Sequence, residues 1–171
     1  MNFSADNRVL ALCVALALPV AAHAQAGAEW TSPGGSPQGT RYSTLTQITP
    51  ANVGTLVQDF TYQTGLKASH EGQPLVVGTT LYLVTPYPNN LVALDLTHGG
   101  KVLWTFQPNP NTYARGVVCC DIVNRGASYA NGMIYYNLLD ASTVAVNATT
   151  GAQVWRTCHS SPRHSRRHSA L

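Results

Sequence analysis

Charged side chains are scarce in this chain. Asp, Glu, Lys and Arg make up 10% of its 171 residues, whereas hydrophobic residue types make up 44%. No phosphate-binding glycine loop, no zinc-ligand spacing and no Ser-His-Asp arrangement stands out along the sequence. What the chain does have is Val, Thr, Tyr, Gly and Pro, a composition typical of domains built from strands and turns. The sequence therefore predicts an all-β fold.

Long apolar runs are also missing. The longest, Val9–Val20, is too short to cross a bilayer comfortably. It follows Arg8 and precedes Ala-Ala-His-Ala, and this order of a basic region, an apolar core and a small-residue end is typical of a secretory signal peptide. We expect residues 1–24 to be that signal, with cleavage after Ala24. Export leads to an oxidising compartment, where disulfides can persist.

Excess positive charge is confined to the C-terminal tail. The formal net charge is +3, and six basic residues balance six acidic ones once residues 1–24 and 158–171 are set aside. The abrupt change in composition predicts a domain at 25–157 and an aberrant, disordered tail at 158–171, with a frame-shifted or artificial terminus as its origin. A nucleic-acid patch and a His-rich metal site are less favoured readings of the tail. We expect no nucleic-acid partner.

The middle of the chain contains two copies of one repeating unit. Val92–Trp104 is echoed by Val144–Trp155, about 52 residues further along. Each copy follows a segment with the pattern of a strand pair, at 73–84 and at 127–136. This offset is close to the length of a four-stranded blade in a β-propeller. The sequence therefore predicts a β-propeller of which about two blades are present.

Local signals add detail to this repeat. Gly78-Thr79 and Asn131-Gly132 suit the turns of tight hairpins. The Val-Ala-Leu/Val strands are expected to alternate, and Trp104 and Trp155 are expected to stack one blade on the next. Thr49–Asn52 has the pattern of a helix start, with a strand after it through Phe60 and Tyr62. A propeller closes its sheets into a ring, so we expect two blades to be a fragment.

Cys119 and Cys120 are adjacent, and a bridge between them would close a very small ring. Their Cα atoms lie about 3.8 Å apart across a trans peptide, whereas ordinary disulfides prefer about 4.4–6.8 Å. Such a strained bridge stabilises little by loop closure and is more typical of a functional than of a structural role. Two reduced, buried thiols are the open alternative.

Motifs on both sides of these cysteines resemble one enzyme family. Arg41-Tyr-Ser-Thr-Leu, His70–Val77 and Cys119–Gly126 are similar to the motifs of pyrroloquinoline-quinone (PQQ) dependent alcohol dehydrogenases, the methanol and ethanol dehydrogenase family. The resemblance extends from Trp30 to Thr157. It implies an eight-bladed β-propeller with PQQ in a central funnel and a location in the periplasm.

The resemblance also implies roles for four residues. Cys119 and Cys120 would form a vicinal disulfide against the planar cofactor. Arg125 would bind PQQ, a tricarboxylate for which a planar guanidinium is a natural partner. Glu71 would lie at the polar edge of the cofactor and orient the arginine. From the residues alone, a structural ion pair for Arg125 and a solvent-facing turn position for Glu71 remain open.

The family reaction oxidises primary alcohols with PQQ and a calcium or lanthanide ion, and electrons pass to a cytochrome c. A homodimer is possible in the full-length family. The family's general base and metal ligands match nothing in this chain, so we expect no catalytic or metal-binding residue here and no activity of the chain alone. The alternative is a non-catalytic β-propeller scaffold of the cell envelope. A scaffold has no need of the glutamate, the cysteine pair and the arginine together.

Three other residues carry weaker signals. Arg115 lies near the cysteines but matches no family motif, and His70 receives no role. Asn147 begins a formal glycosylation sequon, but it lies within the repeat turn and is expected to be structural.

Overall fold

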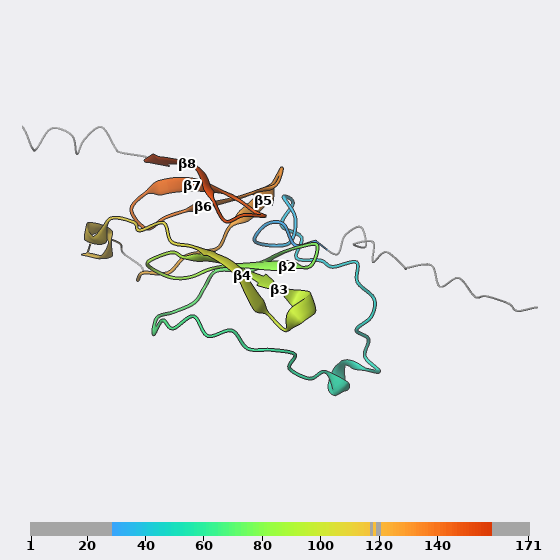
Figure 1. The fold of residues 1–171 in the computed structure, drawn as a ribbon. Coiled ribbons are helices and arrows are strands. Elements are labelled where there is room, and N and C mark those ends of the chain that lie inside the picture. Colours follow the sequence, from blue (N-terminus) through green and yellow to red (C-terminus); the bar gives the residue numbers. More distant parts are fainter. Residues whose placement is uncertain (1–28, 117, 119–120, 159–171) are drawn as a thin grey trace, which may run out of the picture.

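The computed structural model describes residues 29–116, 118 and 121–158 (Figure 1). The expected signal peptide, the residues from 159 onward and the Cys119-Cys120 pair lie outside these described residues. Two four-stranded antiparallel sheets are packed on each other, and their strands follow one another in chain order. The all-β prediction and the division into two repeating units are confirmed.

Each sheet is a simple meander with the same plan. The first has the order β1-β2-β3-β4 and the second the order β5-β6-β7-β8. The first contains β1 (Leu75–Val77), β2 (Thr80–Val84), β3 (Leu91–Asp95) and β4 (Lys101–Phe106). The second contains β5 (Ser128–Ala130), β6 (Met133–Asn137), β7 (Ser142–Asn147) and β8 (Gln153–Cys158), so that the last strand includes the first residue of the expected tail.

Three short 3-10 helices lie between or before the strands in the described ranges. They are η1 (Val53–Thr55), η2 (Leu96–His98) and η3 (Thr112–Gly116). None of the helices in these ranges has the length and apolar character needed to span a membrane.

The two predicted hairpin turns are present. Val77 pairs with Thr80, and Ala130 pairs with Met133, so each turn has two residues. In the second turn Asn131 and Gly132 have φ angles of 49° and 75°, the left-handed values that such tight hairpins require.

The central strands differ from the expected alternation. Val92, Ala93 and Leu94 are all buried, as are the equivalent residues of β7. Ala93 belongs to the hydrophobic cluster between the two sheets, and larger side chains on the neighbouring strands flank it. Ala93 pairs with Tyr82 on one side and with Trp104 on the other, and these two rings lie 5.8 Å apart over the small alanine. Tyr135 and Trp155 cover Ala145 in the same way, with ring centroids 6.0 Å apart.

Trp104 also joins the two sheets, as the sequence predicted. A Cβ atom added to Gly151 would lie 2.7 Å from the Trp104 ring, so the indole packs directly against the glycine backbone of the second sheet. The Tyr82 hydroxyl donates to Ala148 O at 3.1 Å beside this contact. Trp155, the equivalent residue of the second sheet, is 41% exposed.

Phe60 repeats the Trp104 contact on the first sheet. A Cβ atom at Gly100 would clash with the Phe60 ring, and Gly100 and Gly151 have φ angles of 73° and 72°. Residues 60–68 alternate between half-buried and exposed, the pattern of a strand. They nevertheless pair with no strand among the described residues, so the strand predicted through Phe60 and Tyr62 is wrong as a sheet element.

The predicted helix start at Thr49–Asn52 is wrong. The Asn52 side chain accepts a hydrogen bond from Thr49 N at 2.7 Å and donates one to Gln47 O at 2.7 Å. These bonds close a turn, and the helix that follows is the single 3-10 turn η1, which begins at Val53 and receives no side-chain cap from Asn52.

We predict that Gly151→Ala destabilises the fold more than Gly132→Ala. Both glycines have φ near +75°, so each substitution incurs about 1–2 kcal/mol of left-handed backbone strain. Only at Gly151 does the new methyl group meet the Trp104 ring, which adds about 1–3 kcal/mol of overpacking. Urea unfolding of both variants measures the difference. Equal losses would contradict the role assigned to this contact.

Candidate functional site

Glu71 and Arg125, the two described residues of the predicted cofactor site, lie at one end of the two sheets. In a meander, the loops before the first strand, after the second and after the fourth share one end. Glu71 precedes β1, Arg125 precedes β5, and the β4–β5 connection that includes the cysteine pair also begins at this end. The β2–β3 and β6–β7 loops complete it (Figure 1).

A short parallel bridge brings the two sheets together here. Gln73 bridges to Gly126, which places the residues before β1 beside those before β5. Gly126 has φ of 106°, and a Cβ atom there would lie 2.8 Å from Gln73 O. A side chain at this position would therefore force the two chain segments apart.

Glu71 and Arg125 form an ion pair across this bridge. Glu71 Oε2 lies 2.8 Å from Arg125 Nη1. The glutamate side chain is 41% exposed and the arginine side chain is 77% exposed, so the pair is open to solvent. The structure thus brings together two of the four residues predicted for the cofactor site. The other two, Cys119 and Cys120, lie outside the described residues.

Asn124 fixes the backbone that carries Arg125, and sequence reasoning missed it. Its side chain is buried, donates from Nδ2 to Asn137 O at 2.9 Å and accepts from Gly126 N at 2.9 Å. An asparagine whose side chain bonds two residues onward is a common turn device, but the contact with β6 has no local sequence signal. Arg125 is therefore held between two restrained residues while its guanidinium stays open to solvent.

A cavity of about 290 Å³ is lined in part by Arg125. One cationic side chain and two asparagines give it polar character, and the β6–β7 loop supplies an apolar side. This donor set suits an anionic, carboxylate-bearing group at the Arg125 end. Its lining residues are Val123, Asn124, Arg125, Gly126, Asn137, Leu138 and Leu139.

Three weaker candidates have structural contacts. His70 hydrogen-bonds to Thr64 Oγ1 at 2.9 Å and to Ala68 O at 2.8 Å. The Arg115 guanidinium carbon lies 5.2 Å from the centroid of the Tyr87 ring, a cation–π contact. The Asn147 side chain accepts from the backbone N–H groups two and three residues onward, at 3.0 and 2.9 Å, and so closes the repeat turn. Within the described ranges, no three His, Cys, Asp or Glu side chains gather closely enough to hold a metal ion.

Comparison with known proteins places this geometry in a family. Residues 30–156 match the family described as "PQQ: Glucose/ethanol/alcohol dehydrogenase, beta-propeller domain". The chain is 43% identical over 132 residues to a lanthanide-dependent methanol dehydrogenase of Methylacidiphilum fumariolicum, a match that covers 77% of this chain and 22% of the relative. It is 44% identical over 133 residues to methanol dehydrogenase [cytochrome c] subunit 1 of Methylobacterium organophilum, covering 74% and 21%.

A solved structure agrees with these matches. The europium-containing methanol dehydrogenase superposes with a TM-score of 0.73 at 43% identity, over 77% of this chain and 23% of that one. This chain thus spans about a fifth of the length of the relatives it matches. The predicted family and the β-propeller fold are both confirmed: the chain belongs to the PQQ-dependent alcohol dehydrogenase family and forms part of its β-propeller domain.

Proposed function

We propose that this chain supplies one wall of a PQQ site in an enzyme that oxidises primary alcohols. Arg125 binds an anionic oxygen of the cofactor, Glu71 orients the guanidinium, and Cys119 and Cys120 form a bridged pair against the ring. The observation that carries the proposal is the exposed 2.8 Å ion pair held over the Gln73–Gly126 bridge. The family match and the relatives named as methanol dehydrogenases support it.

The energetics of the pair favour a ligand-binding role over a structural one. An exposed ion pair contributes about 0–1 kcal/mol to stability. Other contacts hold the backbone around this pair, because the Asn124 side chain is buried and Gly126 has no room for a side chain. The ion pair is therefore not needed to fix the backbone. A guanidinium that is 77% exposed still has most of its five donors available. A carboxylate ligand can use these donors without displacing Glu71.

When bound, PQQ supplies the electron acceptor for alcohol oxidation, and a calcium or lanthanide ion supplies the Lewis acid. This chain contributes the binding groups on one side of that site. We propose that the general base and metal ligands come from sequence outside this chain, so that the chain alone does not oxidise alcohols. The alternative, a non-catalytic envelope scaffold, gives no reason for an exposed glutamate and arginine held together at the bridge.

The proposed partners follow from the relatives. Several of them are named as cytochrome c-linked dehydrogenases, which supports a cytochrome c as electron acceptor. A periplasmic location agrees with this acceptor and with the signal-like sequence at 1–24. A homodimer of the full-length protein stays a prediction.

We expect Glu71→Gln to change the free energy of unfolding by less than about 1 kcal/mol, because the pair it removes is open to solvent. Urea denaturation of the variant and the unaltered chain measures the change. A loss of several kcal/mol would make the pair a structural element and weaken its assignment to ligand binding.

We expect Arg125→Gln to weaken PQQ binding at least tenfold, since a charge-assisted hydrogen bond contributes about 1.5–3 kcal/mol. Equilibrium dialysis of PQQ against the chain, with Ca²⁺ or La³⁺ present, gives the dissociation constants. Arg115→Gln is the matched control, because Arg115 is another exposed arginine at the same end of the sheets. Its PQQ affinity should stay within twofold of the unaltered chain.

Two results would contradict the proposal. One is the absence of PQQ binding to the unaltered chain, and the other is an equal loss in the Arg125 and Arg115 variants. Alcohol-dependent dye reduction by the chain with PQQ and metal would separately contradict the assignment of base and metal ligands to sequence outside it.

Expression in a Gram-negative host should yield a periplasmic protein that begins at Gln25, because the apolar segment is expected to be cleaved after Ala24. The mass of the intact protein from the periplasmic fraction checks this. A full-length cytoplasmic product would rule out the signal.

A further inference from the structure

The outer face of the second sheet, the face that carries Tyr135 and Trp155, has an aromatic ring without the glycine that its counterpart packs on. Trp104 of the first sheet packs on Gly151. Both tryptophans follow a shift in register at the same point of their last strand pair, so the two rings occupy equivalent positions. No glycine in the described ranges packs on the Trp155 ring in this way, and Trp155 is 41% exposed.

A tyrosine hydroxyl on the same face has only a weak acceptor. The Tyr82 hydroxyl of the first sheet donates to Ala148 O of the second sheet at 3.1 Å. Tyr135 has the equivalent position on β6, but its hydroxyl is directed to Met133 Sδ at 3.6 Å, and a thioether accepts hydrogen bonds weakly. A surface that matched this face would therefore offer a bare glycine backbone and a backbone carbonyl.

The far face of the first sheet, the one turned away from the second sheet, offers both groups. Gly100 has a φ angle of 73°, against 72° at Gly151, and each glycine lies between the last two strands of its sheet. Leu96 N donates at 2.9 Å to the turn between the first two strands of its sheet, as Ala148 N does in the second sheet. The Leu96 carbonyl therefore corresponds to the Ala148 carbonyl that accepts from Tyr82.

Within one chain, residues 60–68 cover this far face. Phe60 packs on Gly100, and the segment runs along the side of the first sheet that faces away from the second (Figure 1). Val92 and Leu94 alternate with residues of the inter-sheet cluster, so they point to the far face, and they are only 2% and 1% exposed. In the part of the chain that the structure describes, residues 60–68 nevertheless make no backbone hydrogen bond to either sheet. Side-chain contacts alone hold this cover, so a larger ring can compete with it.

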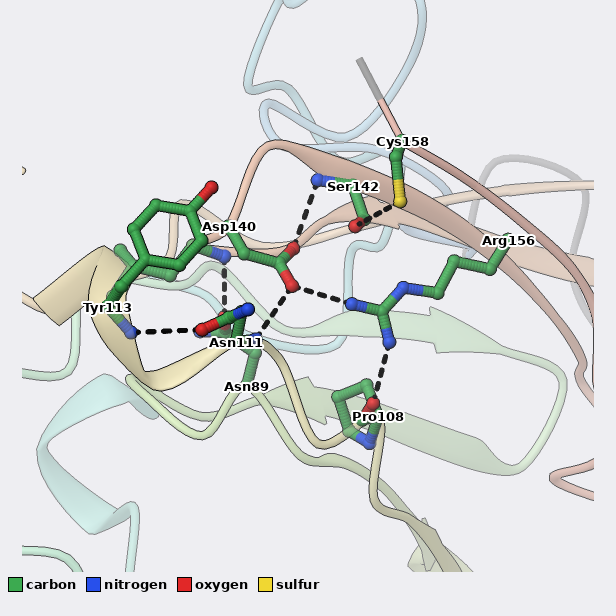
Figure 2. A network of polar contacts seen from close by, with 9 residues as sticks. Asn89, Pro108, Asn111, Tyr113, Asp140, Ser142, Arg156 and Cys158 are labelled. Atoms are coloured by element: carbon green, nitrogen blue, oxygen red, sulfur yellow. Dashed lines mark hydrogen bonds and ion pairs between the residues drawn. The ribbon is translucent and has the colours of Figure 1, made fainter. Parts of the chain in front are cut away.

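Strand β8, which carries Trp155, is held firmly on its other side (Figure 2). Arg156 Nη2 lies 2.6 Å from Asp140 Oδ2 in the β6–β7 loop, and Nη1 donates to Pro108 O at 2.9 Å. The Asp140 side chain is only 4% exposed and also accepts from Asn111 N at 2.8 Å. Burial alone would raise the pKa of Asp140, but its hydrogen bonds and the charge of Arg156 lower that pKa below its ordinary value. Asp140 is therefore ionised at neutral pH, and the ion pair fixes the strand before any partner binds.

We propose that the outer face of the second sheet binds the far face of the first sheet in a second copy of this chain, with Trp155 in the place of Phe60 on Gly100. The contact continues the interface between the two sheets by one more repeat, because it joins the same two kinds of face. Tyr135 then donates to Leu96 O of the second copy. The contact is heterologous, so each copy keeps one free face and association continues into rings or open chains. It involves no cofactor and is independent of the function proposed above.

Sedimentation velocity over a range of protein concentrations tests the proposal, with dithiothreitol present because Cys158 is a free, exposed thiol. We expect the average mass to rise with concentration. Trp155→Ala should lower the association constant at least tenfold, a loss typical of a central aromatic residue in an interface. Tyr113→Ala is the matched control, since Tyr113 is 61% exposed on η3, outside both sheets, and its association should stay within twofold. A chain that stays monomeric at every concentration, or equal losses in the two variants, would overturn the proposal.

Phe60→Ala should strengthen the association several-fold, because it removes the competitor for Gly100 within the chain. Val57→Ala is the control, since Val57 is 88% exposed just before the same segment, and it should change nothing. The gain should disappear in the double variant Phe60→Ala, Trp155→Ala. If the double variant associates as strongly as Phe60→Ala, newly exposed apolar surface rather than the Trp155 contact drives the association, and the proposal is wrong.

Mixing experiments test the direction of the contact. The double variant keeps an uncovered far face but has no Trp155, so an excess of it should convert the fluorescently labelled, unaltered chain into complexes of two chains. A contact between two Trp155 faces would give no such complex, and that result would overturn the head-to-tail arrangement. If Phe60→Ala fails to fold, Tyr135→Phe replaces it as a test, with an association constant about two- to tenfold lower because one hydrogen bond is lost. An unchanged constant in Tyr135→Phe would overturn the placement of its hydroxyl on Leu96 O.

Discussion

The packing of an aromatic ring on a bare glycine backbone is the constraint on which the rest of this structure depends. Trp104 lies against Gly151, where even a Cβ atom would come within 2.7 Å, and this contact sets how closely the two sheets approach. Apolar side chains buried between the sheets then fill a fixed gap. The same close approach at the site end lets Gln73 bridge to Gly126. Glu71 and Arg125 meet because the sheets are this near.

The repeat itself could be predicted from sequence because its signals are local. Hairpin turns and the two tryptophans recur at offsets of 51–53 residues, and hydrophobic strands lie between them. Phe60 shows where such reasoning stops. Phe60 packs on Gly100 as Trp104 packs on Gly151. Its segment lacks the second strand of the repeat, so the sequence around it gives no sign of this contact. The burial of β3 on both faces was missed for a related reason, since Tyr82 and Trp104 cover Ala93 from neighbouring strands.

The candidate site was predictable only in part. Glu71 and Arg125 were singled out because the short motifs around them resemble those of a family. They lie 54 positions apart in the sequence, and nothing local to either residue predicts that they are 2.8 Å apart in the fold. Asn124 reaches β6, and Asp140 reaches residues 111 and 156, through the tertiary fold rather than through spacing along the chain. Contacts of this kind depend on which loops lie together at one end of the sheets. That arrangement follows from the whole fold and cannot be read from local sequence patterns.

The two ion pairs at this end of the molecule divide two tasks that physical chemistry keeps apart. A buried carboxylate needs its acceptors matched, and the 4% exposed Asp140 accepts from Arg156, Asn111 N and Ser142 N, so its oxygens have little capacity left for a ligand. An exposed pair adds little to stability, so Glu71 and Arg125 can exchange water for a ligand with little effect on the fold. Rigidity around an open charge is what preorganised recognition of a carboxylate requires, because the ordering of the charged group is then complete before the ligand arrives.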